Sequence, residues 1–194
     1  MIATCAKLCE QSYDEHAPGF FDVGDFRYGV FETEYGTIVC IRGTANASNW
    51  LTDARAFPTR SCGGYLAHKG FVNAYRELCS GGMPTLKGQK VIATGHSLGG
   101  AIATLLAEHT GCQLVTFGSP RVYWRFGKVP SIRHSRIVRD DDPVPLVPRF
   151  LYRHQCEPLT LKDSDHHLIQ IEDHFMSGYV KAIEKSSFFD CKVH

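Results

Sequence analysis

The chain has 194 residues, 43% of them hydrophobic, which is enough to bury the core of a single domain. Lysine and arginine total 21 against 20 acidic residues, and this balance provides no long-range field to attract nucleic acid or an anionic membrane. No basic leader followed by an apolar run is visible, and no stretch is apolar enough to span a membrane. We therefore expect one domain over residues 1–194, no nucleic-acid partner, no transmembrane segment and a cytoplasmic location. A secreted, processed form is the alternative.

The chain contains eight cysteines, an even number that permits a disulfide framework. Because no secretion signal is visible, reduced thiols are favoured over disulfides. The sequence has no Cys-x-x-Cys pair, so structural zinc is not expected. No other metal and no cofactor is required by the patterns described below.

The first predicted elements are a helix and a hairpin. Ile2, Cys5, Ala6, Cys9 and Tyr13 are expected to share one face of an amphipathic helix at the start of the chain. Residues 14–24 have the composition of a loop, and residues 26–32 and 37–41 are predicted as two strands joined by a turn. A second helix is expected to begin near His68 and to end near Ser80.

The most informative segment is residues 91–109, where an apolar run meets Gly95-His96-Ser97-Leu98-Gly99 and continues into a helix of small residues. This strand, Gly-x-Ser-x-Gly turn and helix are typical of a nucleophile elbow. The sharp turn strains the backbone of its central residue and requires flanking glycines, because a Cβ there would clash. Ser97 is thereby predicted as the nucleophile. The amide of Leu98, at the helix N-terminus, is predicted to face the oxyanion formed by attack on a carbonyl.

The second half of the chain continues the alternation of strands and helices. Residues 113–117 and 132–138 are expected as buried strands, residues 149–153 and 158–161 as a late antiparallel pair, residues 168–171 as a short strand and residues 174–185 as a closing helix. In the closing helix, Phe175, Tyr179 and Ile183 form the predicted inward stripe. This alternation predicts a layered α/β fold.

A serine hydroxyl is a poor nucleophile at neutral pH, so Ser97 needs a base and a carboxylate that orients the base. The elbow fold has the order serine, acid, histidine, which directs attention to Asp140, Asp141 and Asp142 after the strand at 132–138. The residues alone do not choose among these three. His174 is the best-placed base because the start of a helix holds an imidazole more rigidly than a loop does. The other candidates are His134, His154, His166 and His167.

Ordered segments along most of the chain resemble the class 3 lipases, a family of α/β-hydrolases. These segments are TIVCIRGT, NWLTDARAFP, AHKGFVNAY, TGHSLGGA, TFGSPRV, RIVRDDDPVPLVP and DHFMSGY. The resemblance implies a three-layer α/β-hydrolase fold, with a mostly parallel central sheet flanked by helices. It also implies that Asp142 is the acid and His174 the base, and that Thr44 provides a second oxyanion-hole amide beside that of Leu98. His68 matches a position expected to support the oxyanion loop.

These patterns predict a metal-independent serine carboxylester hydrolase that forms an acyl-enzyme on Ser97, and the resemblance implies lipid esters such as acylglycerols as substrates. A non-catalytic protein of this fold that binds lipid or a partner is the alternative. A small-ester esterase and a phospholipase also remain open. Residues 45–64 are predicted as a short mobile lid whose Trp50, Leu51 and Phe57 contact a lipid interface transiently. A fixed edge without a lid is the other interpretation of this segment.

Overall fold

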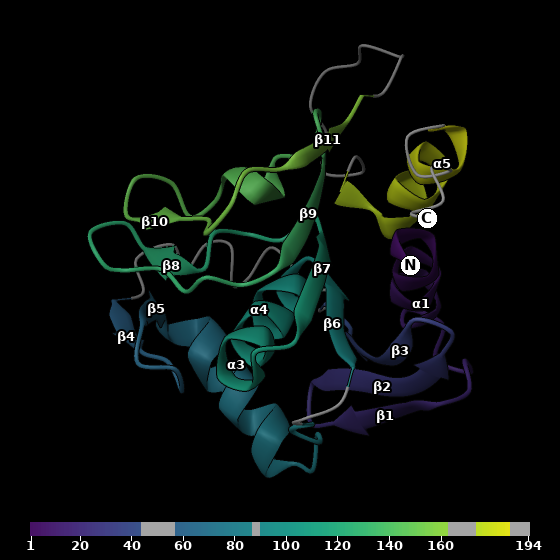
Figure 1. Cartoon of the computed structure of the whole chain (residues 1–194), viewed down its shortest axis with the longest axis horizontal. Coiled ribbons are helices and arrows are strands. Elements are labelled where there is room, and N and C mark those ends of the chain that lie inside the picture. The colour runs from purple at the N-terminus through teal and green to yellow at the C-terminus, as the bar shows by residue number, and fades with distance from the viewer. Residues whose placement is uncertain (44–56, 87–89, 163–173, 187–194) are drawn as a thin grey trace.

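The computed structural model describes residues 1–43, 57–86, 90–162 and 174–186, which form a central β-sheet with helices on both faces (Figure 1). The strands of this sheet are β1 (Phe20–Val23), β2 (Phe26–Thr33), β3 (Gly36–Ile41), β6 (Val91–His96), β7 (Gln113–Phe117), β9 (His134–Arg139) and β11 (Leu159–Leu161). Their order is β1-β2-β3-β6-β7-β9-β11. The first three pair antiparallel and the others extend the sheet in parallel from β3.

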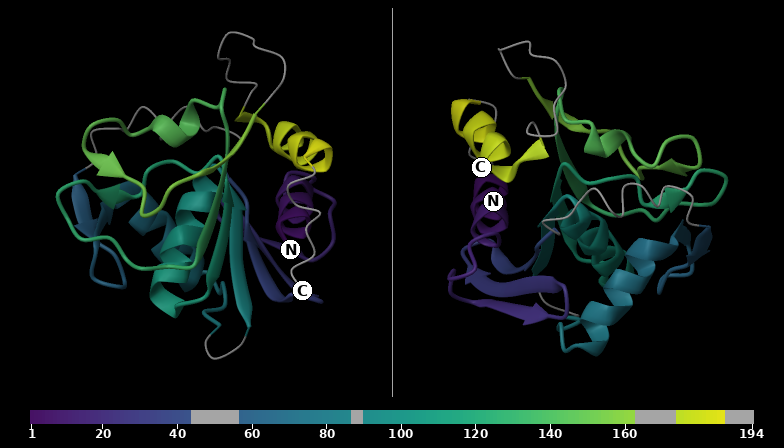
Figure 2. Two further views of the ribbon diagram at one scale, coloured as in Figure 1. Left: turned by 45° about the horizontal axis from the view of Figure 1, so that its top comes forward. Right: turned by 180° about the vertical axis from the view of Figure 1, so that it is seen from behind.

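Two pairs of helices cover the two faces of the sheet. Helices α1 (Ile2–Gln11) and α5 (Met176–Lys185) pack side by side on one face, and α3 (Lys69–Ser80) and α4 (Leu98–Thr110) lie on the other (Figure 2). Successive side chains of a strand point to opposite faces. On β3, Ile38 and Cys40 join the core beneath α1 and α5, whereas Val39 and Ile41 join the core beneath α3 and α4. These three layers confirm the predicted α/β-hydrolase-like fold.

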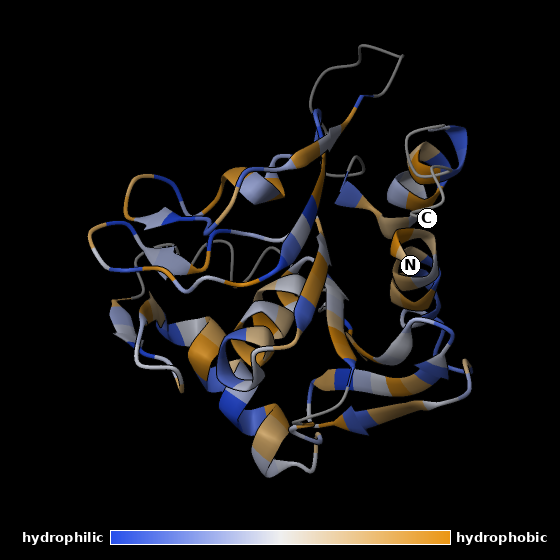
Figure 3. Cartoon of the chain, viewed as in Figure 1, coloured by the Kyte–Doolittle hydropathy of each residue, from blue (hydrophilic) through white to orange (hydrophobic). Residues whose placement is uncertain are grey.

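The hydropathy of each element agrees with its position. Figure 3 shows hydrophobic residues within the strands of the sheet and hydrophilic residues on the outer side of α5. Helix α4 is buried from Leu98 to Ala107. A helix that is apolar all round is expected where other elements cover every side of it. Among the described helices, none has both the length and the hydropathy needed to cross a membrane.

A second, smaller antiparallel sheet lies beside the central one. It consists of β4 (Pro58–Arg60), β5 (Leu66–His68), β8 (Tyr123–Trp124) and β10 (Tyr152–Arg153), in the order β10-β8-β5-β4. The predicted pairing of residues 149–153 with residues 158–161 is therefore wrong. Strand β10 pairs with β8 and buries Tyr152 against Trp124, whereas β11 pairs with β9 and buries Leu161 at the edge of the central core.

Three further details differ from the sequence-based expectation or lie beyond the described residues. Strand β1 occupies part of the predicted loop at 14–24, because Phe20 packs edge-on against Phe31 of the neighbouring strand. Helix α5 begins at Met176, and Phe175 before it is 59% exposed, so it is not part of the inward stripe. The strand predicted at 168–171 and Cys191 lie outside the described residues, and the seven described cysteines are unpaired.

Candidate active site

The elbow forms at the junction of β6 and α4, as predicted from the sequence. Ser97 adopts φ 57° and ψ −130°, a conformation that is strained for a residue with a side chain. A Cβ on Gly95 would overlap the backbone of Gly99, and a Cβ on Gly99 would overlap the carbonyl of Ile41. The amide of Ser97 donates to the carbonyl of Phe117 at 3.0 Å, which ties the turn to β7. Close backbone approach therefore requires both glycines and holds Ser97 at the edge of the sheet.

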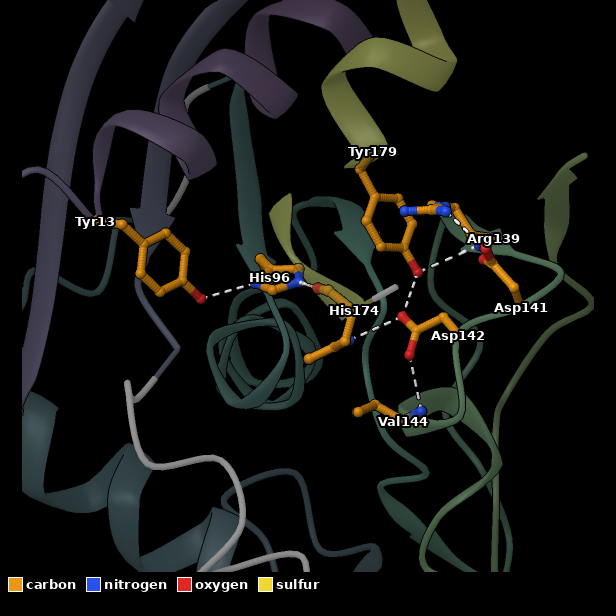
Figure 4. Close-up of polar contacts among 8 residues, drawn as sticks. All are labelled: Tyr13, His96, Arg139, Asp141, Asp142, Val144, His174 and Tyr179. Atoms are coloured by element: carbon orange, nitrogen blue, oxygen red, sulfur yellow. Dashed lines mark hydrogen bonds and ion pairs between the residues drawn. The ribbon is translucent and has the colours of Figure 1, made fainter. Parts of the chain in front are cut away.

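Asp142 follows β9 and hydrogen-bonds His174 (Figure 4). Its Oδ2 atom lies 2.8 Å from Nδ1 of His174 and accepts the hydroxyl proton of Tyr179 at 2.6 Å. Its Oδ1 atom accepts the amide of Val144 at 2.8 Å. The side chain of Asp142 is fully buried, so these donors replace the water that a carboxylate would otherwise bind. These three donors, from His174, Tyr179 and the amide of Val144, fix the position of the carboxylate.

The imidazole of His174 is presented with a defined tautomer. Because a carboxylate only accepts hydrogen bonds, Nδ1 of His174 carries the proton toward Asp142, and Nε2 is left with a lone pair. Nε2 of His174 and Oγ of Ser97 are both buried, and neither has a hydrogen-bond partner among the residues the structure describes. A ring nitrogen with a free lone pair can take the proton of a serine hydroxyl during nucleophilic attack.

The two neighbouring carboxylates, Asp140 and Asp141, make other contacts than Asp142 does. The Oδ2 atom of Asp141 pairs with the guanidinium of Arg139 at 2.6 Å. Asp140 is exposed, and its amide donates to the carbonyl of Leu161. Of the three aspartates that the residue pattern left open, Asp142 is the one joined to His174 by a hydrogen bond.

The other candidate bases lie in different environments. His134 is hydrogen-bonded to Thr116 at 2.8 Å, and His154 donates to the carbonyl of Pro145 at 2.8 Å. Burial, with the nearby charge of Arg136, lowers the pKa of each of these two imidazoles to about 3. Such imidazoles are too weakly basic to take a proton from serine at neutral pH. His166 and His167 lie outside the described part of the chain.

Two residues that the sequence did not link to this site, His96 and Tyr13, form a chain of hydrogen bonds to the backbone of His174. Nε2 of His96 lies 2.7 Å from the carbonyl oxygen of His174, and Nδ1 of His96 lies 2.7 Å from the hydroxyl of Tyr13. Burial, followed by the neighbouring His174, lowers the pKa of His96 well below its usual range. His96 lies within the elbow, but both of its partners come from segments near the two ends of the chain. No local pattern marks Tyr13 as one of them, because it is 83 positions away in the sequence.

The predicted oxyanion positions are described in part. Leu98 is the first residue of α4, where backbone amides lack acceptors within the helix. Thr44 lies outside the described residues, but Gly43 before it packs against the elbow. A Cβ on Gly43 would come within 2.8 Å of the carbonyl oxygen of His96 and 3.1 Å of Cβ of Ser97. The turn that leads to Thr44 therefore passes directly beside Ser97.

Only the end of the predicted lid can be located. Trp50 and Leu51 lie outside the described residues, and Phe57 is 84% exposed. The following residues form β4 and a turn in which the amide of Gly63 donates to Oε1 of Glu108 at 2.8 Å. Gly63, near the end of the predicted lid, is thus tied to α4. His68, expected to support the oxyanion loop, is buried against the rings of Phe71 and Tyr152.

Comparison with known proteins agrees with this architecture. The solved lipase from Rhizopus microsporus var. chinensis superposes with a TM-score of 0.65 at 22% identity, covering 87% of this chain and 75% of that one. The native Rhizomucor miehei lipase in complex with its propeptide gives a TM-score of 0.61 at 24% identity, covering 84% and 68%. The fold is that of an α/β-hydrolase.

The family follows from the sequence comparison. The model of the family described as Lipase (class 3) matches residues 38–152, and the chain belongs to this family. The secreted mono- and diacylglycerol lipase 1 of Fusarium solani is 33% identical over 138 residues, covering 60% of this chain and 41% of that protein. The lipase of Rhizomucor miehei is 28% identical over 165 residues, covering 72% and 46%. The chain thus spans less than half the length of these two curated relatives.

Proposed function

We propose that the protein is a serine carboxylester hydrolase in which Ser97, His174 and Asp142 act as nucleophile, base and orienting acid. The observation that carries this proposal is the buried hydrogen bond from His174 to Asp142, which leaves the other ring nitrogen of His174 with a free lone pair. His96, the residue next to the strained Ser97, bonds the backbone of His174 and so ties the base to the elbow. This is the arrangement that acyl transfer through a serine requires.

In the proposed reaction, Oγ of Ser97 attacks the ester carbonyl carbon while Nε2 of His174 takes the hydroxyl proton. The carbonyl electrons move onto oxygen, where the amides of Leu98 and Thr44 stabilise the negative charge. The oxyanion collapses, the bond to the alcohol breaks, and His174 returns the proton to the leaving alkoxide. Water then repeats the sequence on the acyl-enzyme and releases the carboxylic acid. Asp142 stabilises the imidazolium during both steps.

We infer acylglycerols as the substrate class, because one relative is named a mono- and diacylglycerol lipase and the other a lipase. The same relative is described as secreted. The expectation of a cytoplasmic location has no support from the relatives, so the secreted alternative is the one we propose. A secreted protein would meet extracellular lipid esters as its substrate.

The experiment is hydrolysis of a medium-chain diacylglycerol and of p-nitrophenyl esters of increasing chain length. Ser97→Ala is expected to lose up to roughly a million-fold in turnover, as in other serine triads. Ser80→Ala, which removes a different serine hydroxyl at the end of α3 that contacts the carbonyl of Glu77, is the control and should retain activity. Equal hydrolysis by Ser97→Ala and its parent would leave the non-catalytic, lipid-binding alternative as the better description.

We further propose that Trp50, Leu51 and Phe57 contact the lipid interface. The high exposure of the Phe57 ring supports this proposal, because a large apolar side chain in water gains free energy on transfer to lipid. The rate on a short-chain ester should rise where the substrate passes its solubility limit, and Trp50→Ala and Phe57→Ser should each reduce that rise. A flat response with all three proteins would favour an esterase without a lid.

A further inference from the structure

A cavity of about 590 Å³ lies at the small sheet, outside the site around Ser97. Four arginines line it, Arg121, Arg125, Arg136 and Arg153, and we call it the arginine pocket. Its volume falls in the range of small-ligand sites, roughly 300–1,000 Å³. None of its residues has a role in the proposed reaction.

The arginine pocket carries a strong excess of positive charge. Glu157 is its one carboxylate among the described lining residues, and His154 is neutral at pH 7 because its pKa is lowered to about 3. Within the described chain, no hydrogen bond or ion pair joins the guanidinium groups of Arg121 and Arg125 to another residue. Among the described residues, the pocket therefore gathers four cations around a single carboxylate.

Gathering these cations works against the stability of the folded chain. Burial, together with the charges of Arg149 and Arg125, lowers the pKa of the Arg121 guanidinium. A destabilising arrangement of this kind is expected where a ligand supplies the missing counter-charge. The planar guanidinium fork matches the oxygens of a phosphate group and binds two of them at once.

Two of the arginines are held in place by backbone acceptors. Nε of Arg136 donates to the carbonyl of Cys156 at 3.2 Å, and a terminal nitrogen of Arg153 donates to the carbonyl of Gly127 at 2.6 Å. Each guanidinium has five N–H donors, so both retain donors for a ligand. The pocket is thus partly organised before any ligand binds.

Exposed apolar side chains adjoin the arginines along the chain. Phe126 follows Arg125 and is 77% exposed, and Phe150 follows Arg149 and is 76% exposed. The amide of Arg125 donates to the carbonyl of Leu151 at 2.9 Å, which joins the two loops. Figure 3 shows hydrophobic and hydrophilic residues next to one another on these loops around β8 and β10. Cationic groups beside exposed aromatic rings suit a surface that presents phosphate above hydrocarbon.

We propose that the arginine pocket binds the phosphate group of an anionic phospholipid, while Phe126 and Phe150 enter the lipid beside it. The site anchors the protein at an anionic lipid surface and is separate from the site where esters are cleaved. The charge of the pocket selects the phosphate, and the two rings select a lipid source over a soluble phosphate.

The test uses the full chain with Ser97→Ala, so that the vesicles stay intact and the result does not depend on the proposed reaction. Vesicles of phosphatidylcholine containing roughly one-fifth phosphatidylglycerol are sedimented with the protein, and vesicles of phosphatidylcholine alone serve as the neutral comparison. Arg125→Gln should weaken binding to the anionic vesicles about fivefold, since a basic residue near such a surface contributes about 1 kcal/mol. Adding Arg121→Gln should weaken it further. Lys181→Gln removes one charge from the exposed side of α5, on the other face of the sheet, and should bind like the parent.

Two results would overturn the proposal. One is equal sedimentation of the parent and the Arg121→Gln/Arg125→Gln double variant, with both shown to be folded by circular dichroism. The other is a protein that does not bind anionic vesicles but is protected against thermal unfolding by inorganic phosphate, with the protection lost in Arg125→Gln. The ligand would then be a soluble phosphate. Phe126→Ser is expected to weaken vesicle binding and to leave any effect of inorganic phosphate unchanged, which separates the two sources of phosphate.

Discussion

The ring of His96 holds the backbone of His174 in place: Nε2 of His96 lies 2.7 Å from the carbonyl oxygen of His174, and the two rings stack with centroids 4.5 Å apart. Because a carbonyl only accepts, Nε2 of His96 carries a proton and Nδ1 accepts the hydroxyl proton of Tyr13. The residue next to Ser97 therefore positions an imidazole that lies 78 residues further along the chain. Tyr13 in turn fixes the tautomer of His96.

Tyr13→Phe should uncouple this arrangement while leaving the ring of residue 13 in place. The variant leaves Nδ1 of His96 buried without a donor, which costs about 1–3 kcal/mol in the free energy of unfolding. It should also lower kcat with little change in KM, because the position of His174 is affected and substrate contacts are not. Urea unfolding and ester kinetics measure the two effects. Tyr35→Phe, on the turn between β2 and β3, is the control, and a Tyr13→Phe variant that behaves like it would argue against the positioning role.

Gly118 provides a test of how closely Asp142 and His174 must approach. A Cβ at this position would lie 2.7 Å from Oδ2 of Asp142 and 2.9 Å from Cε1 of His174. Gly118→Ala should therefore push the pair apart and lower kcat by about a hundredfold, the cost of a misplacement of roughly 1 Å.

The control for this variant is Gly111→Ala. Gly111 has a similar positive φ, 72° against 55° for Gly118, but a Cβ there meets nothing within 4 Å. Both variants bear the cost of an L-residue in the left-handed region, about 1–2 kcal/mol, which thermal unfolding measures. If both lose the same activity, backbone strain and not displacement of the pair is responsible.

Asp142→Asn and Asp141→Asn separate the orienting acid from its neighbour. Asn cannot hold the imidazolium of His174, so Asp142→Asn should reduce kcat by about ten-thousand-fold, as the loss of the acid does in other serine triads. Asp141→Asn removes an ion pair with Arg139 and should leave kcat close to that of the parent. Steady-state kinetics on a soluble ester decide the matter, and the reverse order of the two losses would move the acid to residue 141.

Local pattern predicted much of the fold. The strand expected at 113–117 has the same bounds as β7, and the elbow strand and helix lie where residues 91–109 placed them. These segments are mostly apolar runs of five or more residues, as burial on every side requires. Strands β8 and β10 have two residues each, so no periodicity marks them, and their pairing depends on contacts between distant segments.

The site was predicted less completely. Residue order led to a cluster of three aspartates, and the resemblance to a family, not the spacing, singled out Asp142. The bonds from Tyr13 to His96 and from His96 to the backbone of His174 join segments that only the folded chain brings together. A sequence window cannot reveal such partners, because 83 positions separate Tyr13 from His96 and 78 separate His96 from His174.

Stability should fall at acid pH because of the partly buried imidazole of His134. Burial lowers its pKa from 6.5 to about 3, so between these values the unfolded chain binds a proton that the folded chain does not. The free energy of unfolding is therefore highest above pH 6.5 and declines toward pH 3, by up to about 1.4 kcal/mol per pH unit from this group. His134→Gln should flatten the decline, as measured by urea unfolding at neutral and acid pH. An unchanged slope would mean that His134 takes up its proton in the folded state.

The measurement that tests the central claim most directly is covalent labelling by a fluorophosphonate, with the modified residue identified by peptide mass spectrometry. The account predicts one adduct, on Oγ of Ser97, with labelling slowed strongly by His174→Ala and abolished by Ser97→Ala. Absence of labelling in a folded, unmodified chain, or labelling that persists in Ser97→Ala, would contradict it.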